Sequence, residues 1–403
     1  MTRPDEAPDD APEAFIPLAD YAAPGGPVGH LARRLLDRVR RVLASEEAPV
    51  VEDEGLREAT RATVDDHMGT PDCAPLVREL DATLDGWATG GRAAEDTLRL
   101  VVLPPGDPHG LLAGWAARRA HAVLEPPSFD ALLAPRERSP LDAAPGGDGV
   151  LVVPRLERWF VRHRNGLAHV RALLAELAAG ERRCVVGCNS WAWLYLARAV
   201  EADLLLPPPL TFAPFDAPRL HRWLAELAVA DGTRDVVFRT SGSGTDVFAR
   251  DADDGFESDF LPGLAARSRG VPWVAWRQWR RGLRTRREGA DGDGEDGPED
   301  AADGADADGP EDTLWLVETG EPVLPIGHER TARLVLHALL LHGELATAEL
   351  ARVLPVVGES NIVPALARAG FVERADGRYR CATSAYPAIF ESLATAGLST
   401  PAC

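Results

Sequence analysis

Short apolar runs that alternate with helical segments constrain the fold of this chain more than any other feature of its sequence. The runs lie at 98–103, 122–124, 150–153 and 183–186, with a weaker one at 203–206. Between them, apolar residues recur at helical spacing, most clearly at 111–121, 158–178 and 190–200. Buried strands that alternate with helices are typical of a parallel sheet covered by helices. We therefore expect an α/β domain over residues 96–230.

The C-terminal part of the chain has a different pattern. Helical spacing occurs at 330–342, 347–354 and 360–369, and the apolar and aromatic residues of 371–381 flank an Asp376-Gly377 turn of the kind found in hairpins. Three helices followed by a hairpin predict a winged helix, in a domain over 313–403 that includes a strand at 314–317 and a last helix at 388–396.

Outside these two domains, the sequence contains two acidic stretches and predicts further helices. Residues 260–283 predict two helices broken at Gly270-Val271-Pro272, because glycine can end one helix and proline can begin the next; we assign 231–285 to a helical lid. Residues 286–312 are expected to be a disordered linker, since 288–312 holds 12 acids and no apolar side chain larger than alanine. An acidic, disordered start (1–28) and a helical extension (29–95, with helices at 30–45 and 74–87) complete the expected organisation.

The overall composition limits where the chain works and what it binds. It has 403 residues and a net charge of −20, and all 43 basic residues are arginine, so it contains no lysine. This charge disfavours nucleic acid as a partner. No apolar run approaches the roughly 18 residues of a membrane-spanning helix, the first residues do not look like a signal peptide, and the five cysteines are scattered. We expect a cytoplasmic protein with no membrane insertion.

From about residue 98 to 397, the order of elements resembles the AAA+ and STAND branches of the P-loop NTPases, in which a sheet domain is followed by a lid and often a winged helix. The segments that carry the resemblance are RLVVLPPGDPHGLL after the first strand, GVLVVPRLERWF, CVVGCNSWAW and the lid break Gly270-Val271-Pro272. The resemblance implies a vestigial nucleotide pocket at Gly106, Gly110, Arg155 and Asn189, with Asn189 at the sensor-1 position.

The residues that such a pocket needs for chemistry are replaced here. A phosphate loop requires a lysine and a magnesium-binding hydroxyl, but Leu111 and Leu112 follow Gly110, and Asp107 would place a negative charge beside the phosphates. The strand-end position of the magnesium-binding carboxylate carries Pro154; Glu157 comes three residues later, where we expect it to cap or form an ion pair. We therefore expect no catalytic residue, no metal site and no nucleotide cofactor.

Two groups of residues are candidates for binding a macromolecule. Tryptophans three apart, flanked by arginines, favour core packing, and the helix that carries them is also our candidate for a partner-binding face: Trp273, Trp276, Arg277, Trp279 and Arg280. A winged helix that binds DNA needs basic residues on its third helix and wing, for which the candidates are Arg368, Arg374, Arg378 and Arg380.

These observations favour an NTPase-like scaffold that is not an enzyme and acts through a protein partner. The alternatives are a winged-helix DNA-binding regulator and a nucleotide-binding switch with non-standard phosphate contacts.

Overall fold

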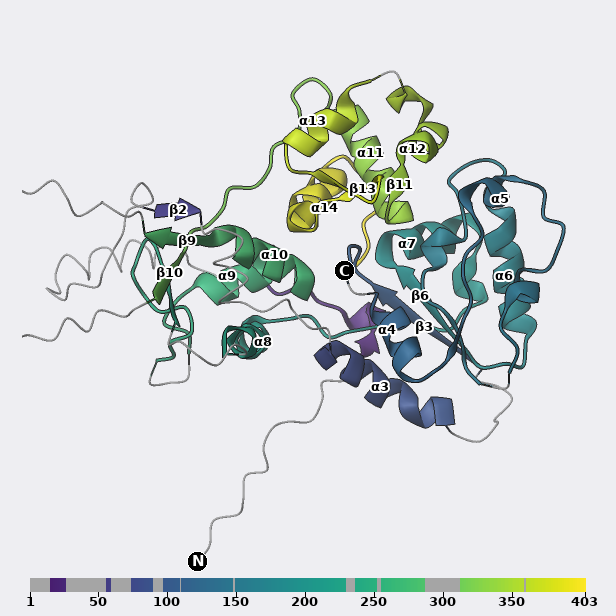
Figure 1. Cartoon of the computed structure of the whole chain (residues 1–403), viewed down its shortest axis with the longest axis horizontal. Helices are drawn as coiled ribbons and strands as arrows, with labels where there is room; N and C mark the ends of the chain where they lie inside the picture. Colours follow the sequence, from purple (N-terminus) through teal and green to yellow (C-terminus); the bar gives the residue numbers. More distant parts are fainter. Residues whose placement is uncertain are drawn as a thin grey trace, which may run out of the picture. The chain divides into compact units, whose positions relative to one another are not determined.

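The structure, a computed structural model, divides into two compact units (Figure 1). Unit 1 comprises residues 1–22, 72–214 and 322–403, and unit 2 comprises residues 23–71 and 215–321. The described residues are 15–26, 56–58, 74–89, 97–108, 110–147, 149–229, 236–251, 255–286, 312–358 and 360–403. The expected helix at 30–45 and nearly all of both acidic stretches lie outside them.

Unit 1 is built on a six-stranded, largely parallel sheet, which confirms the expected α/β class. Its strand order is β1 (Ile16–Pro17), β7 (Leu210–Thr211), β3 (Leu98–Leu103), β6 (Cys184–Asn189), β5 (Leu151–Val153) and β4 (Ala122–Val123), and only the edge strand β1 is antiparallel. Leu103 pairs with Asn189, so β3 and β6 end side by side. The strand order reverses direction at β3, and open α/β sheets bind their ligands at the carboxyl ends of the strands near such a point.

Helices cover this sheet, and its strands are buried as the apolar runs predict. The helices are α3 (Ala74–Thr89), α4 (Leu111–Arg118), α5 (Phe129–Leu133), α6 (Ala168–Ala179) and α7 (Ser190–Ala199), with 3₁₀ turns η3 (Pro140–Ala143), η4 (Leu156–Arg158) and η5 (Ala202–Leu204). The apolar faces of α6 and α7 form one core with the strands, in which Val102, Val153 and Val186 are fully buried.

Two elements of the α/β part differ from the sequence expectation. The helix expected at 158–178 begins at Ala168, because residues 161–166 form a tight turn in which Val161 N donates to Gly166 O. A side chain at position 166 would place its Cβ 2.2 Å from Val161 O, so only glycine fits there. The apolar run at 203–206 is not a strand but overlaps η5; the fifth parallel strand, β7, follows the prolines at 207–209.

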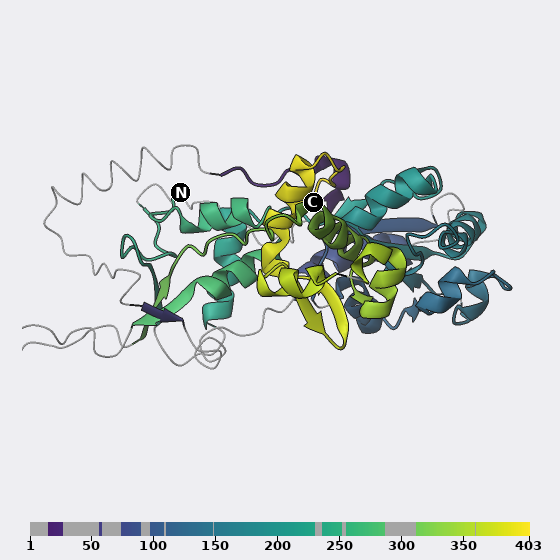
Figure 2. The ribbon, with the colours of Figure 1, turned by 90° about the horizontal axis from the view of Figure 1, so that it is seen from above.

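The C-terminal part of unit 1, residues 329–403, is named here the C-terminal module. It contains α11 (Glu329–His342), β11 (Leu345–Ala346), α12 (Thr347–Val353), η6 (Pro355–Val357), α13 (Ile362–Arg368), β12 (Val372–Ala375), β13 (Arg378–Cys381), η7 (Thr383–Ala385) and α14 (Tyr386–Thr395). Asp376 and Gly377 have φ angles of 51° and 79°, which suits a two-residue turn between the antiparallel strands β12 and β13. Figure 2 shows this yellow hairpin projecting from the helices of the module.

In its described residues, unit 2 combines a small sheet with the helices α8, α9 and α10, whereas the sequence predicted a helical lid. The sheet has the order β2 (Leu56–Glu58), β9 (Leu283–Arg286), β10 (Asp312–Leu316) and β8 (Val236–Thr240), and the helices are α8 (Ala217–Val229), α9 (Phe260–Arg267) and α10 (Pro272–Gly282). As predicted, α9 and α10 are separated at Gly270, which has a φ of 73°, and Pro272 is the first residue of α10. The strand expected near 314 lies in this sheet and not in the C-terminal module.

Within the part of the chain that the structure describes, every helix is too short or too polar to cross a membrane.

Candidate functional site

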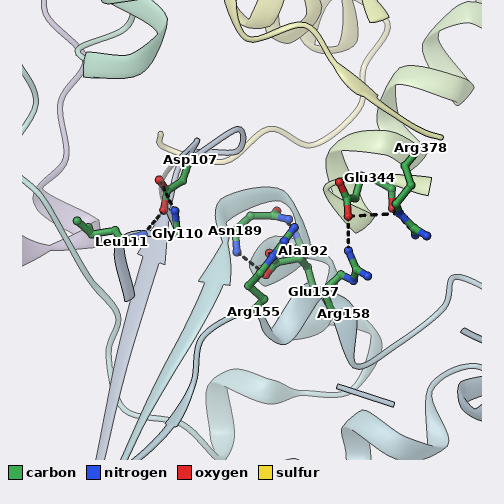
Figure 3. A network of polar contacts seen from close by, with 10 residues as sticks. All are labelled: Asp107, Gly110, Leu111, Arg155, Glu157, Arg158, Asn189, Ala192, Glu344 and Arg378. Atoms are coloured by element: carbon green, nitrogen blue, oxygen red, sulfur yellow. Dashed lines mark hydrogen bonds and ion pairs between the residues drawn. The ribbon is translucent and has the colours of Figure 1, made fainter. Parts of the chain in front are cut away.

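In the loop between β3 and α4, main-chain N–H groups donate hydrogen bonds to a carboxylate side chain of the same loop. Asp107 accepts hydrogen bonds from Gly110 N (3.1 Å) and from Leu111 N (2.6 Å), at the first turn of α4 (Figure 3). Gly106 and Gly110 have φ angles of 83° and 60°, the left-handed conformation that lets the loop fold back on itself. The first N–H groups of a helix have no partner within the helix and therefore attract anions. In this chain the anion is a side chain of the loop.

The two leucines that follow Gly110 belong to the hydrophobic core. Leu111 and Leu112 are 1% and 3% exposed. At Gly187, in the middle of β6, a Cβ atom would lie 2.2 Å from Leu112 Cδ1 and 2.4 Å from the carbonyl oxygen of Pro154. The Leu112 side chain and the carbonyl group of Pro154 therefore pack directly against the main chain of β6 at Gly187. Two apolar side chains therefore occupy the start of α4 as core residues.

Glu157 joins the strand ends of β5 and β6. Its carboxylate is 6% exposed and accepts hydrogen bonds from Arg155 Nε and from Asn189 N, both at 3.2 Å. Asn189 in turn accepts a hydrogen bond from Ala192 N (2.8 Å) through its side-chain oxygen and so caps α7. The ion pair expected for Glu157 is present. Its bond to Asn189 was not foreseen, because the pairing of β5 with β6 is not visible in a sequence.

The four residues expected to form a vestigial nucleotide pocket thus share the carboxyl edge of the sheet. Arg155 and Asn189 are linked through Glu157, and the loop that holds Gly106 and Gly110 starts beside Asn189, since Leu103 pairs with that residue. The side-chain nitrogen of Asn189 is buried and has no hydrogen-bond partner among the described residues. No group of three or more metal-binding side chains occurs in the described ranges.

An ionic network attaches the C-terminal module to this edge. Arg158, in η4, donates to Glu344 at 2.7 Å, and Glu344 also pairs with Arg378 at 3.3 Å (Figure 3). Arg378 further pairs with Glu349 at 2.5 Å. Burial alone would raise the pKa of Glu344, but the hydrogen bond and charge of Arg158 outweigh it and lower the pKa below its ordinary value.

Aromatic rings and two histidines complete the contact between α11 and the α/β part. Phe160 lies 5.0 Å from the ring of His342, and Trp191 lies 5.8 Å from that of His337. Arg162 N donates to His342 Nε2 at 3.4 Å. Burial, with the charge of Arg162, lowers the pKa of His337 to about 4 and that of His342 to about 3. Both histidines are therefore neutral parts of the packing at pH 7.

Three of the four arginines considered for DNA contact face partners within the C-terminal module. Arg378 holds Glu344 and Glu349, as described above, and Arg380 pairs with Glu373 at 2.6 Å. The Arg374 guanidinium lies 5.7 Å from the centre of the Tyr379 ring. Arg368 is exposed at the end of α13. Because acids of the same module pair with Arg378 and Arg380, the hairpin presents less positive potential to a phosphate backbone than free arginines would.

The tryptophans of α10 belong to the core of unit 2, which corrects the expectation of an aromatic partner-binding face. Trp273, Trp276 and Trp279 are 3%, 6% and 0% exposed. The ring of Trp279 lies 5.5 Å from that of Phe238 and 5.6 Å from that of Phe260. The guanidinium groups of Arg277 and Arg280 each lie over the Trp276 ring, 5.1 Å from its centre. The helical spacing of the tryptophans marks the buried face of α10.

No protein-family model and no curated protein matches this chain. Among solved structures, a similar one is the crystal structure of Cdc6p from Pyrobaculum aerophilum, which is 12% identical and is matched over 82% of this chain and 95% of that chain with a TM-score of 0.26.

Proposed function

We propose that this chain is a catalytically inactive, P-loop NTPase-like scaffold with a winged-helix C-terminal module, and that it acts through protein contacts. The observation that supports the proposal best is the position of the Asp107 carboxylate on the N–H groups of Gly110 and Leu111. A phosphate there would meet a negative charge in the place where it needs donors.

The surroundings of that carboxylate support the same function. Lysine is absent from the chain, and the buried Leu111 and Leu112 offer neither positive charge nor a magnesium ligand. Glu157, just after the end of β5, is engaged by Arg155 and by Asn189 N, so both its oxygens already have a donor. Attack of water on a phosphate requires a free base and a bound metal, and this arrangement supplies neither.

The test is thermal unfolding of the full chain with and without millimolar Mg-ATP, Mg-GTP and the two diphosphates. A ligand that binds only the folded state raises the melting temperature by mass action. We expect no shift with any nucleotide. The variant Asp107→Asn, which removes the charge and keeps a hydrogen-bond acceptor, serves as the matched control, and we expect no shift there either because the leucines remain. A rise of several degrees for the natural chain would contradict the proposal and favour a nucleotide switch.

A further inference from the structure

One helix, α11, places two histidines against the α/β part, and both meet the same arginine. His342 Nε2 accepts a hydrogen bond from Arg162 N at 3.4 Å, and His337 Nδ1 lies 3.4 Å from the guanidinium of that arginine. The His342 ring also contacts Phe160, and the His337 ring contacts Trp191 in α7. We name His337, His342 and Arg162 the histidine latch. It lies where α11 packs against α7 and η4 (Figure 1).

The latch keeps two imidazole rings uncharged beside a permanent positive charge. His342 is 3% exposed. Burial, with the charge of Arg162, lowers the pKa of His337 to about 4 and that of His342 to about 3. A histidine surrounded by water has a pKa of about 6.5. In weak acid, a released module therefore binds protons that the docked module does not bind.

The charged groups that face the latch from η4 and from α11 itself act in the same direction. Arg158 in η4 and His337 both lower the pKa of His342, as Arg162 does. A hydrogen bond with the main chain of Glu157 acts in the opposite direction and is outweighed. The Glu157 carboxylate is engaged by Arg155 and by a main-chain N–H group. A proton on either histidine therefore adds a second positive charge directly beside Arg162.

The other elements that pack against α11 are α7, β13, α13 and α14. Their charged residues are Arg198, Arg378, Arg380, Arg368 and Glu391. Arg198, Arg368 and Glu391 are exposed, and the two arginines of β13 pair with acids of the C-terminal module. Burial raises the pKa of Tyr195 in α7, so this side chain is neutral. The latch histidines are thus the groups of this contact whose charge changes between pH 7 and pH 5.

The ion pair beside the latch responds to acid in a lower pH range. The hydrogen bond and charge of Arg158 outweigh burial and lower the pKa of Glu344 below its ordinary value of 4.5. A group of this kind stabilises the folded state until the pH falls through its lowered pKa. The pair of Arg158 and Glu344 therefore persists at pH 5, where the histidines of a released module are protonated.

We propose that the histidine latch is an acid-sensitive switch: protonation of His337 and His342 beside Arg162 releases the C-terminal module from the carboxyl edge of the sheet, while the α/β part stays folded. Release uncovers the rings of Phe160 and Trp191, which are each 1% exposed in the docked state. The switch goes beyond the proposed function, because it operates whether or not the edge of the sheet binds a nucleotide. Between pH 7 and pH 5, each histidine shifts the release equilibrium by about 20-fold, and the two together by about 400-fold.

The test measures release and unfolding on the same full chain. Asp130→Cys and Arg352→Cys replace an exposed ion pair that bridges α5 and α12, and both cysteines are labelled with pyrene maleimide. Two pyrenes in contact emit as an excimer, and this emission disappears when the module leaves α5. Far-UV circular dichroism follows unfolding. We expect the excimer to be lost between pH 6.5 and 5 with the circular dichroism unchanged. Chains with a single introduced cysteine correct for labelling of the natural thiols.

Three variants of the labelled chain identify the groups that respond. His337→Gln/His342→Gln cannot bind the protons and should keep its excimer at pH 5. Arg162→Gln keeps the main-chain donor to His342 and removes the charge that lowers both pKa values. Its docked histidines then bind protons more readily, so release should move to lower pH. The matched control is Glu344→Gln, which removes the ion pair with Arg158 and should leave the fold-change in release between pH 7 and pH 5 unaltered.

An excimer that persists in the natural chain at pH 5 would overturn the proposal, and so would its loss at the same pH as the circular dichroism. Release of the double glutamine variant at the pH of the natural chain would also overturn it, because another group would then be the one that responds. Should that variant fail to fold, Arg162→Gln decides: release at an unchanged or higher pH contradicts the switch.

Discussion

Arg158 and Glu344, which lie 186 positions apart in the sequence, form a partly buried ion pair of 2.7 Å that joins the end of β5 to the C-terminal module. Their side chains are 29% and 25% exposed, so water screens this pair less than an ordinary surface pair. This ion pair is one of several contacts that hold the module at the sheet edge, and its contribution to stability can be measured.

A double-mutant cycle of Arg158→Ala and Glu344→Ala is expected to show a coupling free energy of about 1 kcal/mol in urea unfolding. The control cycle is Arg352→Ala with Asp130→Ala, a pair that also bridges the module and the α/β part but has side chains 51% and 84% exposed. For that pair we expect a coupling near zero. Equal couplings in the two cycles would show that the first pair does not fasten the module.

Replacing Asp107 is expected to weaken the start of α4. Asp107→Ala removes the acceptor for Gly110 N and Leu111 N, and the loss of a helix-capping side chain typically costs about 1 kcal/mol. Asp107→Asn retains one acceptor oxygen and should cost less. Urea unfolding of both variants checks the order. An Ala variant as stable as the natural chain would mean that this carboxylate does not hold the loop.

The neutral histidines of α11 predict a loss of stability in weak acid. Their folded-state pKa values are about 4 for His337 and about 3 for His342, below the value of about 6.5 in an unfolded chain. Between these values the unfolded chain binds more protons, so the free energy of unfolding falls as the pH is lowered from about 6.5, by up to about 1.4 kcal/mol per pH unit for each histidine.

His342→Gln, which keeps an acceptor for Arg162 N, should remove one histidine's share of that slope. Unfolding of the variant and of the natural chain between pH 6.5 and 5 measures the difference in slope. A variant with the full slope would contradict the assignment.

Trp279 distinguishes a core helix from a partner-binding helix in unit 2. Trp279→Ala should reduce stability by about 3 to 5 kcal/mol, as for other buried aromatic residues, because the side chain is 0% exposed. Arg277→Ala on the same helix removes only a cation–π contact with Trp276 and should cost about 1 kcal/mol or less. If Trp279 were an interface anchor instead, its replacement would leave the melting temperature of the isolated chain unaltered.

The pairing of Arg378 predicts the outcome of a DNA-binding experiment. We expect no salt-dependent binding of the chain to a labelled duplex, because this arginine is held by Glu344 and Glu349. Arg378→Ala should lower the melting temperature, whereas Arg368→Ala, at an exposed position, should not. Binding that weakens steeply with salt and is lost in either variant would restore the DNA-binding regulator.

Elements of both the α/β part and the C-terminal module were predictable from local patterns. The run at 98–103 coincides with β3, and the Asp376-Gly377 turn joins β12 to β13 as expected. Both signals are local, because a continuous apolar run and a turn dipeptide depend on a few neighbouring residues. The strand predicted at 203–206 was wrong, because its apolar residues lie in and directly after a 3₁₀ turn that follows α7 and do not enter the sheet.

The contacts of the candidate site were less accessible to sequence reasoning. Asp107 was expected to repel a phosphate, but a sequence does not show that it folds onto the N–H groups of its own loop. The links between Glu157 and Asn189, and between Ser190 and Cys403, join positions 32 and 213 residues apart. Such pairs depend on which strand ends and helices become neighbours, and no local spacing encodes that. The helical spacing of Trp279 and its neighbours fits a core and an interface equally well, so burial had to decide.

The division of the chain into units gives the molecule an unusual connectivity. By their residue ranges, the backbone passes between unit 1 and unit 2 near residues 22, 71, 214 and 321. Four covalent tethers therefore join the units, where a simple two-domain protein has one. A protease that cuts at a single crossing leaves the fragments tied together by the other three. A force that a bound partner exerts on one unit is likewise shared among several connections. One of these follows β7, and another precedes α11.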